Sequence, residues 1–140
     1  MTQIAFLNEI SIPQKVEIEN HIQELGYDFK FLENFSNLLN HDGLSCSING
    51  HKTFFEIYID QTDEIISEEE WIKSDITNQD VAISFVWGAD LAAGACIGLI
   101  SIGLIDKCEA LVYYLDDEMK YTREMLLADT SQFLNELQKK

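Results

Sequence analysis

The sequence predicts an α+β fold, in which an antiparallel or mixed β-sheet, built from two hairpins and a central strand, packs against a buried apolar helix with two or three further helices. Three observations predict this fold. An Asn-Gly pair separates two strand-like runs, an alternating run at 81–87 leads into a long apolar stretch, and two more strand-like runs follow at 110–122. No linker, repeat or low-complexity tract divides residues 1–140, so we expect a single domain.

The first helix is predicted over about residues 12–25. Ser11 and Pro13 are typical of a helix start and Gly26 of a helix end, and apolar residues recur at helical spacing between them. The letters YDFKFLE then alternate as in a half-buried strand, but FLENFSNLL equally favours a helical turn. Residues 27–40 therefore stay open between strand and helix.

The clearest local signal is the Asn49-Gly50 turn between SCSI and HKTFFEIYID, which predicts a β-hairpin. Because the side chains of a strand alternate between its two faces, Phe55, Ile57 and Ile59 are expected to face the core. The side chains expected to face outward are Phe54, Glu56, Tyr58 and Asp60. Half of this outer face is aromatic.

The segment from Asp60 to Asp80 is the most acidic in the chain, with eight acids against one lysine. Ser67 and Glu70 have the spacing of a capping box, in which each side chain bonds the other residue's backbone N–H. This spacing predicts a short helix that includes Trp71 and Ile72.

A long apolar stretch follows, in which Asp90 is the only charged residue from Val81 to Ile105. A membrane span is one reading, because Gly94 and Gly98 form a G-x-x-x-G pair. The uninterrupted part after Asp90 is only fifteen residues long, however, whereas a span needs roughly 20. We therefore expect a buried helix over about 89–106, capped by Asp90, whose glycines let the backbone approach a sheet closely.

The C-terminal part is predicted to contain a second hairpin and a last helix. ALVYYL is typical of a strand, DDEM of a turn and KYT of a short return strand. Asp129 and Gln132 have the spacing of an N-cap pair, so they are expected to start a helix through Phe133 and Leu137.

Composition limits the function more than any motif does. The chain has 25 acids and 9 bases, which gives a net charge of -16. Nucleic-acid binding depends on Lys and Arg replacing counterions, so direct binding to DNA or RNA is not expected. An acidic surface instead speeds the encounter with a basic protein. The 46% hydrophobic content excludes a disordered acidic chain.

The cysteines and the N-terminal segment favour the cytoplasm. Cys46, Cys96 and Cys108 are dispersed and form no C-x-x-C pair, as expected in a reducing compartment. MTQIAFLNEISIPQK has no basic region followed by a long apolar stretch, so we predict no signal peptide and no membrane partner.

No catalytic or metal motif is present, so we expect neither an enzyme nor a cofactor. His21, His41 and His51 are scattered, and the acidic turns lack the spacing of a calcium loop. The sequence also has no G-x-S-x-G nucleophile motif. A small enzyme based on carboxylates stays an alternative.

The remaining functional signal is the interleaving of aromatic and acidic residues. Tyr and Trp are favoured interface anchors, and carboxylates around them attract a basic partner, although core packing is the favoured reading for Trp71 and Tyr113 taken singly. The candidate partner-binding residues are Tyr58, Asp60, Asp63, Glu64, Glu68, Glu69, Glu70, Trp71, Tyr114, Asp116, Asp117 and Glu118.

In size, acidity and several segments, the chain resembles the small acidic immunity proteins that bacteria make beside contact-dependent or polymorphic toxins. The similar segments are ISFVWGADLAAGACIGLISIGLI, ALVYYLDDEMKYT and the terminal TSQFLNEL. The resemblance implies a cytoplasmic inhibitor that binds its toxin tightly, often a nuclease with a basic active site. A non-inhibitory adaptor or self-assembling module stays an alternative, as does a homodimer.

Overall fold

Residues 1–40 and 42–139 of the computed structural model are described here, so the prediction made for His41 lies outside them. The chain forms one seven-stranded antiparallel sheet in the order β2-β3-β4-β5-β1-β6-β7. The strands are β1 (Thr2–Leu7), β2 (Phe29–Phe31), β3 (Gly43–Ile48), β4 (His51–Gln61), β5 (Val81–Val86), β6 (Leu111–Tyr114) and β7 (Met119–Tyr121). The predicted α+β fold is therefore confirmed, and its sheet is antiparallel throughout.

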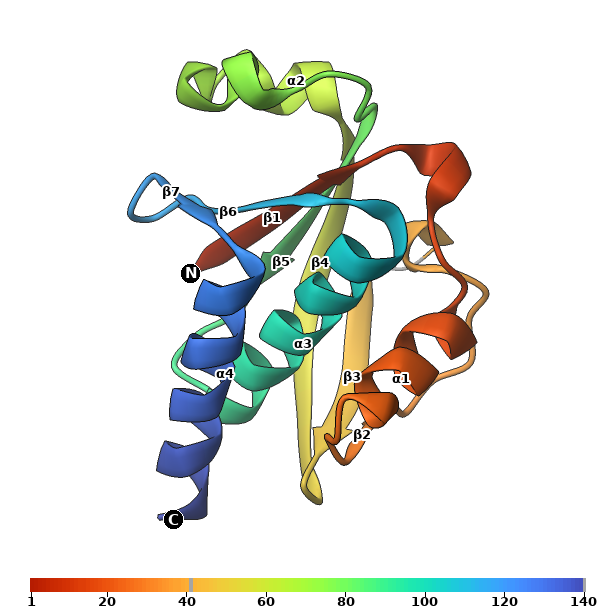
Figure 1. The fold of residues 1–140 in the computed structure, drawn as a ribbon, viewed down its shortest axis with the longest axis vertical. Coiled ribbons are helices and arrows are strands. Elements are labelled where there is room, and N and C mark those ends of the chain that lie inside the picture. Colours follow the sequence, from red (N-terminus) through yellow and green to blue (C-terminus); the bar gives the residue numbers. More distant parts are fainter. Residues whose placement is uncertain (41, 140) are drawn as a thin grey trace.

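Helices lie on both faces of the sheet, but unequally (Figure 1). They are α1 (Lys15–Glu24), α2 (Thr62–Ile66), α3 (Leu91–Cys108) and α4 (Arg123–Gln138), with 3-10 turns η1 (Glu9–Ser11), η2 (Leu38–Asn40) and η3 (Glu70–Asp75). One face is covered by α1, α3 and α4, and the main core lies between them and the sheet. On the other face, α2 and η3 pack over a second, smaller core.

Strand β1 is an interior strand of the sheet, between β5 and β6, and the sequence patterns did not predict it. Ile4, Ala5, Phe6 and Leu7 are all fully buried, because helices cover both faces of this strand. A strand buried on both faces has a continuous apolar run instead of an alternating one, so its periodicity indicates no strand.

Both predicted hairpins are confirmed, and the sheet separates them. The hairpin β3–β4 turns at Asn49 and Gly50, whose φ angles of 51° and 83° suit the Asn-Gly pair. The hairpin β6–β7 lies at the opposite side of the sheet, beyond β5 and β1. In the undecided stretch 27–40, both alternatives occur in part: residues 29–31 form the edge strand β2, and η2 is a single helical turn.

Three helix starts differ from their predictions because local capping signals compete. Helix α1 begins after Gln14, whose capping box with Glu17 replaces the expected start near Ser11. The prediction of a capping box at Ser67 and Glu70 is wrong. Ser67 follows the end of α2, where its hydroxyl donates to the carbonyl of Glu64 at 2.8 Å. Trp71 and Ile72 consequently lie in the 3-10 turn η3 and in no α-helix.

Helix α4 also starts earlier than predicted. Its N-cap is Thr122, whose Oγ1 accepts a hydrogen bond from the backbone N–H of Met125 at 3.2 Å. Asp129 is therefore not a cap and lies in the middle of the helix. The Asp-x-x-Gln spacing at 129–132 therefore occurs by chance inside the helix. The true cap, Thr122, has no Glu or Gln three residues later, so it does not form the capping-box pattern.

The apolar stretch forms α3, which is long and apolar enough to cross a membrane but is 72% buried inside the fold. Asp90 caps this helix as expected, because its Oδ1 accepts from the N–H of Ala92 at 3.0 Å. The expected role of its two glycines is wrong, since they face α4 and not the sheet. A Cβ at Gly94 would lie 3.0 Å from the ring of Phe133, and a Cβ at Gly98 would lie 2.5 Å from Thr130 Oγ1.

Candidate functional site

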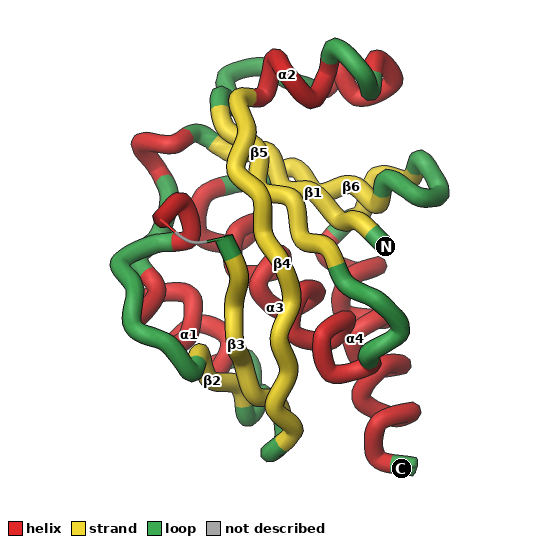
Figure 2. Tube along the Cα trace, turned by 180° about the vertical axis from the view of Figure 1, so that it is seen from behind, coloured by secondary structure: helices red, strands yellow, loops and turns green. Residues whose placement is uncertain are grey.

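The second face of the sheet is only partly covered. The cross-strand register places Tyr58, Ser84, Ile4 and Tyr113 side by side on this face, from β4 to β6. The α2–η3 segment covers the β1 and β6 end of this face and leaves β4 bare (Figure 2). No helix of residues 1–40 or 42–139 covers that bare part.

We call the bare part of β4 the open-face patch, formed by Phe54, Glu56 and Tyr58. Phe54 is 60% exposed and Tyr58 is 50% exposed, as the alternation of β4 predicted. The ring of Phe54 lies across Gly43 of the neighbouring strand β3, where a Cβ would come within 2.6 Å of it. Tyr58 donates a hydrogen bond to Glu56 Oε2 at 2.6 Å, and this bond raises the pKa of the tyrosine above its ordinary value.

The predicted acidic residues lie at one end of this face. Asp60 ends β4, and Asp63 and Glu64 follow in the first turn of α2. Glu68 and Glu69 lie in the connection from α2 to η3, and Glu70 is the first residue of η3. Asp63, Glu64, Glu68 and Glu70 are exposed, so their carboxylates are accessible to a partner.

Several contacts join this acidic segment to the β6–β7 hairpin. Trp71 packs edge-on against Tyr113, with ring centroids 5.5 Å apart, and donates its indole N–H to Glu69 Oε2 at 2.8 Å. The hydroxyl of Tyr113 donates to Asp75 Oδ2 at 2.8 Å, and burial raises the pKa of this tyrosine together with that bond. Trp71 therefore packs on the sheet, and the structure places its acidic neighbours beside the hairpin.

The predicted residues of the β6–β7 turn do not all point the same way. Asp117 and Glu118 are exposed at the turn, whereas Asp116 Oδ1 accepts from the N–H of Thr2 at 3.0 Å. Tyr114 follows Tyr113 in β6, so its side chain points to the opposite face of the sheet. The structure thus separates Tyr114 from the other predicted residues.

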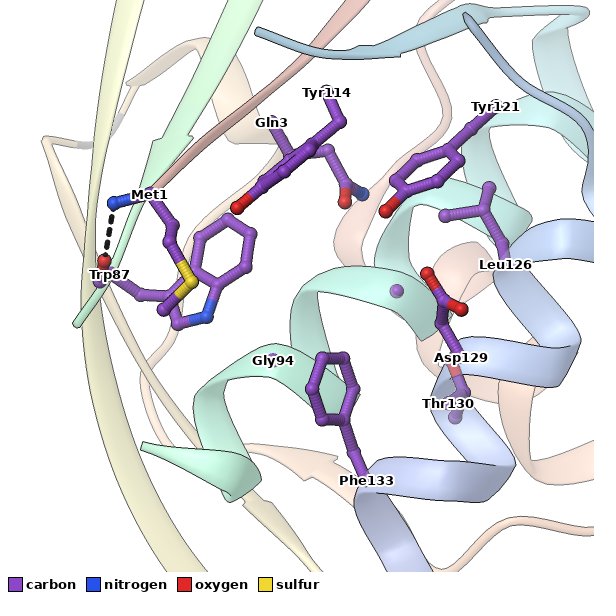
Figure 3. Close-up of a pocket in the computed structure, with 11 residues that line it drawn as sticks. Met1, Gln3, Trp87, Gly94, Tyr114, Tyr121, Leu126, Asp129, Thr130 and Phe133 are labelled. Carbon is purple, nitrogen blue, oxygen red and sulfur yellow. Dashed lines mark hydrogen bonds between the residues drawn. The ribbon is translucent and has the colours of Figure 1, made fainter. Parts of the chain in front are cut away.

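Tyr114 instead lines a small cavity between the sheet, α3 and α4 (Figure 3). We call it the aromatic cavity. Trp87, Tyr114, Tyr121 and Phe133 supply its aromatic walls, and Asp129 and Thr130 supply polar groups from α4. Its volume is about 130 Å³.

The aromatic rings of the cavity also contact one another. Tyr114 and Tyr121 stack with centroids 6.0 Å apart and an angle of 22° between the ring planes. The ring centroid of Trp87 is 6.2 Å from that of Tyr114. Burial raises the pKa of Tyr121, and so does the nearby carboxylate of Asp129. The rings that contact one another therefore come from β6, from β7 and from the residue that follows β5.

Two polar side chains that line the cavity differ in their hydrogen bonding. The amide Nε2 of Gln3 donates to Ser101 Oγ at 2.7 Å. Thr130 is 1% exposed, and its Oγ1 has no hydrogen-bond partner among residues 1–40 and 42–139. A buried hydroxyl without a partner is unfavourable.

Sequence reasoning did not predict this cavity, apart from Tyr114. Trp87 was interpreted as part of a core strand, Tyr121 as a return strand and Asp129 as a helix cap. The available signal was the density of aromatic residues in the second hairpin, but only the register of α4 brings Asp129 and Phe133 to it.

A polar cluster outside the aromatic cavity joins α1, α3 and α4. Arg123 donates from Nε to Asp106 Oδ1 at 2.8 Å and from Nη2 to Oδ2 at 3.1 Å, and His21 Nε2 lies 2.8 Å from the same Oδ2. Burial by itself raises the pKa of Asp106, but the hydrogen bonds from Arg123 and His21 outweigh it, so this pKa is lowered. The cluster fixes three helices relative to one another.

Comparison with known proteins finds no family model, no curated protein and no solved structure that matches the chain.

Proposed function

We propose that the chain is a binding protein that neutralises a basic toxin in the cytoplasm, as an immunity protein does, through the open-face patch and the acidic residues beside it. The observation that supports this proposal best is the exposure of Phe54 and Tyr58 on a bare sheet face whose end is bordered by the carboxylates of α2 and the α2–η3 connection.

The two parts of this surface would act at different stages of binding. The net charge of -16 attracts a basic partner over a distance and raises the association rate. Aromatic side chains that become buried at an interface slow dissociation, because their burial contributes much of the binding energy. Phe54 and Tyr58 are suited to this second role, since they are exposed and held on a rigid strand.

The acidic segment favours a nuclease as the toxin. A nuclease active site is basic because its substrate is a polyanion. Exposed carboxylates such as Glu68 and Glu70 would then occupy the positions of substrate phosphates. This reading accounts for the exposed carboxylates of Asp63, Glu64, Glu68 and Glu70.

The first experiment uses this chain as bait at low salt and co-expresses it with a basic protein that it captures. Growth inhibition by that protein should be relieved by the chain, and the two proteins should copurify at low salt. Unrelieved toxicity, or no complex at any salt concentration, would contradict the proposal.

Variants separate the electrostatic attraction of the partner from the burial of aromatic side chains at the interface. Changing Glu68, Glu69 and Glu70 together to lysine should lower the association rate about tenfold or more at low ionic strength. Phe54→Ala should mainly raise the dissociation rate. Val16→Ala is the matched control, because Val16 is exposed on α1 on the other side of the molecule. Equal effects of Phe54→Ala and Val16→Ala would exclude the open-face patch.

Self-association is a second candidate, favoured by the exposure of Phe54 itself. An exposed aromatic patch on a sheet face is typical of a surface that another copy or an adaptor's partner covers. A homodimer measured by light scattering, and made monomeric by Phe54→Ala, would support this candidate over the inhibitor.

A further inference from the structure

We propose that the aromatic cavity binds a methylated ammonium group. The inference goes beyond the proposed function, because the cavity lies on the opposite face of the sheet from the open-face patch and would take a small cation. It stands on the size of the cavity, on the arrangement of its rings and on its single carboxylate.

The volume of the cavity limits its ligand to a small group. It is about 130 Å³, slightly less than the roughly 150 Å³ of an engineered protein cavity that admits benzene. A trimethylammonium group is of this size. A nucleotide or a folded peptide is far too large to enter.

The rings have the arrangement that a cation prefers. A cation is attracted to an aromatic face within about 6 Å of the ring centre, and Trp gives the strongest attraction. Trp87, Tyr114 and Tyr121 are consecutive neighbours at 6.2 Å and 6.0 Å, and Figure 3 shows Phe133 opposite them across the open space. A cation in that space would therefore lie among several aromatic rings.

The electrostatics of the cavity also favour a positive charge. Asp129 points its carboxylate into the space between Tyr121 and Phe133 (Figure 3). Among the described residues that line the cavity, no side chain is basic. The N-terminal ammonium of Met1 is bound elsewhere, since it donates to the carbonyl of Trp87 at 3.0 Å and lies 3.9 Å from Asp116.

The cavity has few hydrogen-bond acceptors, and this favours a methylated ammonium over a primary one. A primary ammonium has three N–H donors, and each must find an acceptor when it is buried. The lining is mainly apolar, and Asp129 supplies its carboxylate. A methylated ammonium has few or no N–H groups, and its methyl groups pack on ring faces. The hydroxyl of Thr130, which has no partner in the described part of the chain, is available for a polar group attached to the cation.

The test uses the full chain labelled with ¹⁵N and titrated with choline. The two indole N–H signals serve as reporters, because Trp87 lines the cavity and Trp71 lies on the other face of the sheet. The Trp87 signal should shift and saturate while the Trp71 signal stays unchanged. The matched uncharged probe is 3,3-dimethylbutan-1-ol, which has the shape of choline and should bind at least about tenfold more weakly.

Two variants test the carboxylate. Asp129→Asn should weaken choline binding about tenfold and leave binding of the uncharged alcohol unchanged. Glu124→Gln is the control, because it removes the same charge from an exposed position of the same helix. The amide spectrum and the unfolding midpoint of each variant show whether it folds, and Asp129→Glu should restore binding if Asp129→Asn is native-like.

A peptide with one trimethyllysine distinguishes the source of the group. Tighter binding of choline supports a free small molecule, tighter binding of the peptide supports a modified protein, and either supports the methylated ammonium. The proposal is overturned if the uncharged alcohol binds as tightly as choline, if Asp129→Asn has no more effect than Glu124→Gln, or if Trp87 shows no saturable shift. None of these results depends on finding a toxin.

Discussion

Gly98 decides how closely α3 and α4 can pack. It lies in the middle of α3, where glycine is intrinsically unfavourable by about 1 kcal/mol relative to alanine. A side chain there would place Cβ 2.5 Å from Thr130 Oγ1, which is closer than real Cβ atoms approach a neighbour. The close approach of the two helices therefore outweighs the helix propensity, and it also brings α4 near enough for its side chains to line the aromatic cavity.

We expect Gly98→Ala to lower the free energy of unfolding by about 1–2 kcal/mol, because overpacking a buried site outweighs the gain in helix propensity. Urea unfolding measures this change. The control is Gly88→Ala, an exposed position with nothing within 4 Å of an added Cβ and an ordinary φ. A stabilised Gly98→Ala protein would show that α4 moves away from α3 easily.

At the scale of elements, the ion cluster around Asp106 holds helices that are distant in sequence. His21 comes from α1, and Arg123 is the first residue of α4. Asp106 lies near the C-terminal end of α3, where the helix dipole disfavours a carboxylate. Its two basic neighbours compensate, which explains why a charged residue is tolerated there.

The lowered pKa of Asp106 predicts a pH-dependent stability. A carboxyl group whose pKa is lower in the folded state stabilises the fold above its ordinary value of 3.8, and this contribution is lost as the pH falls through the folded-state pKa. At pH 7, Asp106→Asn should therefore be less stable than the natural chain by roughly 2 kcal/mol. The difference should shrink as the pH falls below about 4 and through the folded-state pKa of Asp106. Urea unfolding at a series of pH values checks this, and a constant difference would exclude the charge as its cause.

At the scale of the whole molecule, the excess of acids opposes folding and favours partner binding. Like charges repel more in the compact state than in the unfolded chain, so a net charge of -16 destabilises the fold. Salt screens this repulsion, and it equally screens attraction to a basic partner. Salt should therefore act in opposite directions on folding and on association.

We expect the midpoint of thermal unfolding to rise between 0.02 M and 0.3 M sodium chloride, while the association rate with a basic partner falls. The variant with Glu68, Glu69 and Glu70 changed to lysine should show smaller salt effects on both. Scanning calorimetry and stopped-flow fluorescence measure the two quantities. A midpoint that falls with salt would mean that favourable ion pairs dominate the folded state.

Local signals explain which parts of this molecule could be predicted from the sequence. The Asn49-Gly50 turn, the alternating β5 and the apolar α3 each have a pattern within a few residues, and each was predicted correctly. Strand β1 has no such pattern because both of its faces are buried. The bare part of β4 and the aromatic cavity depend on where α2 and α4 stop and start, and those boundaries are set by competing caps.

The interior position of β1 affects how the protein folds during synthesis. This strand leaves the ribosome before either of its neighbours, since β5 begins at Val81 and β6 at Leu111. Its apolar residues must stay unpaired until most of the chain has been made, and such long-range pairing makes folding slow. Until then the nascent chain exposes an apolar, aggregation-prone segment that chaperones would recognise.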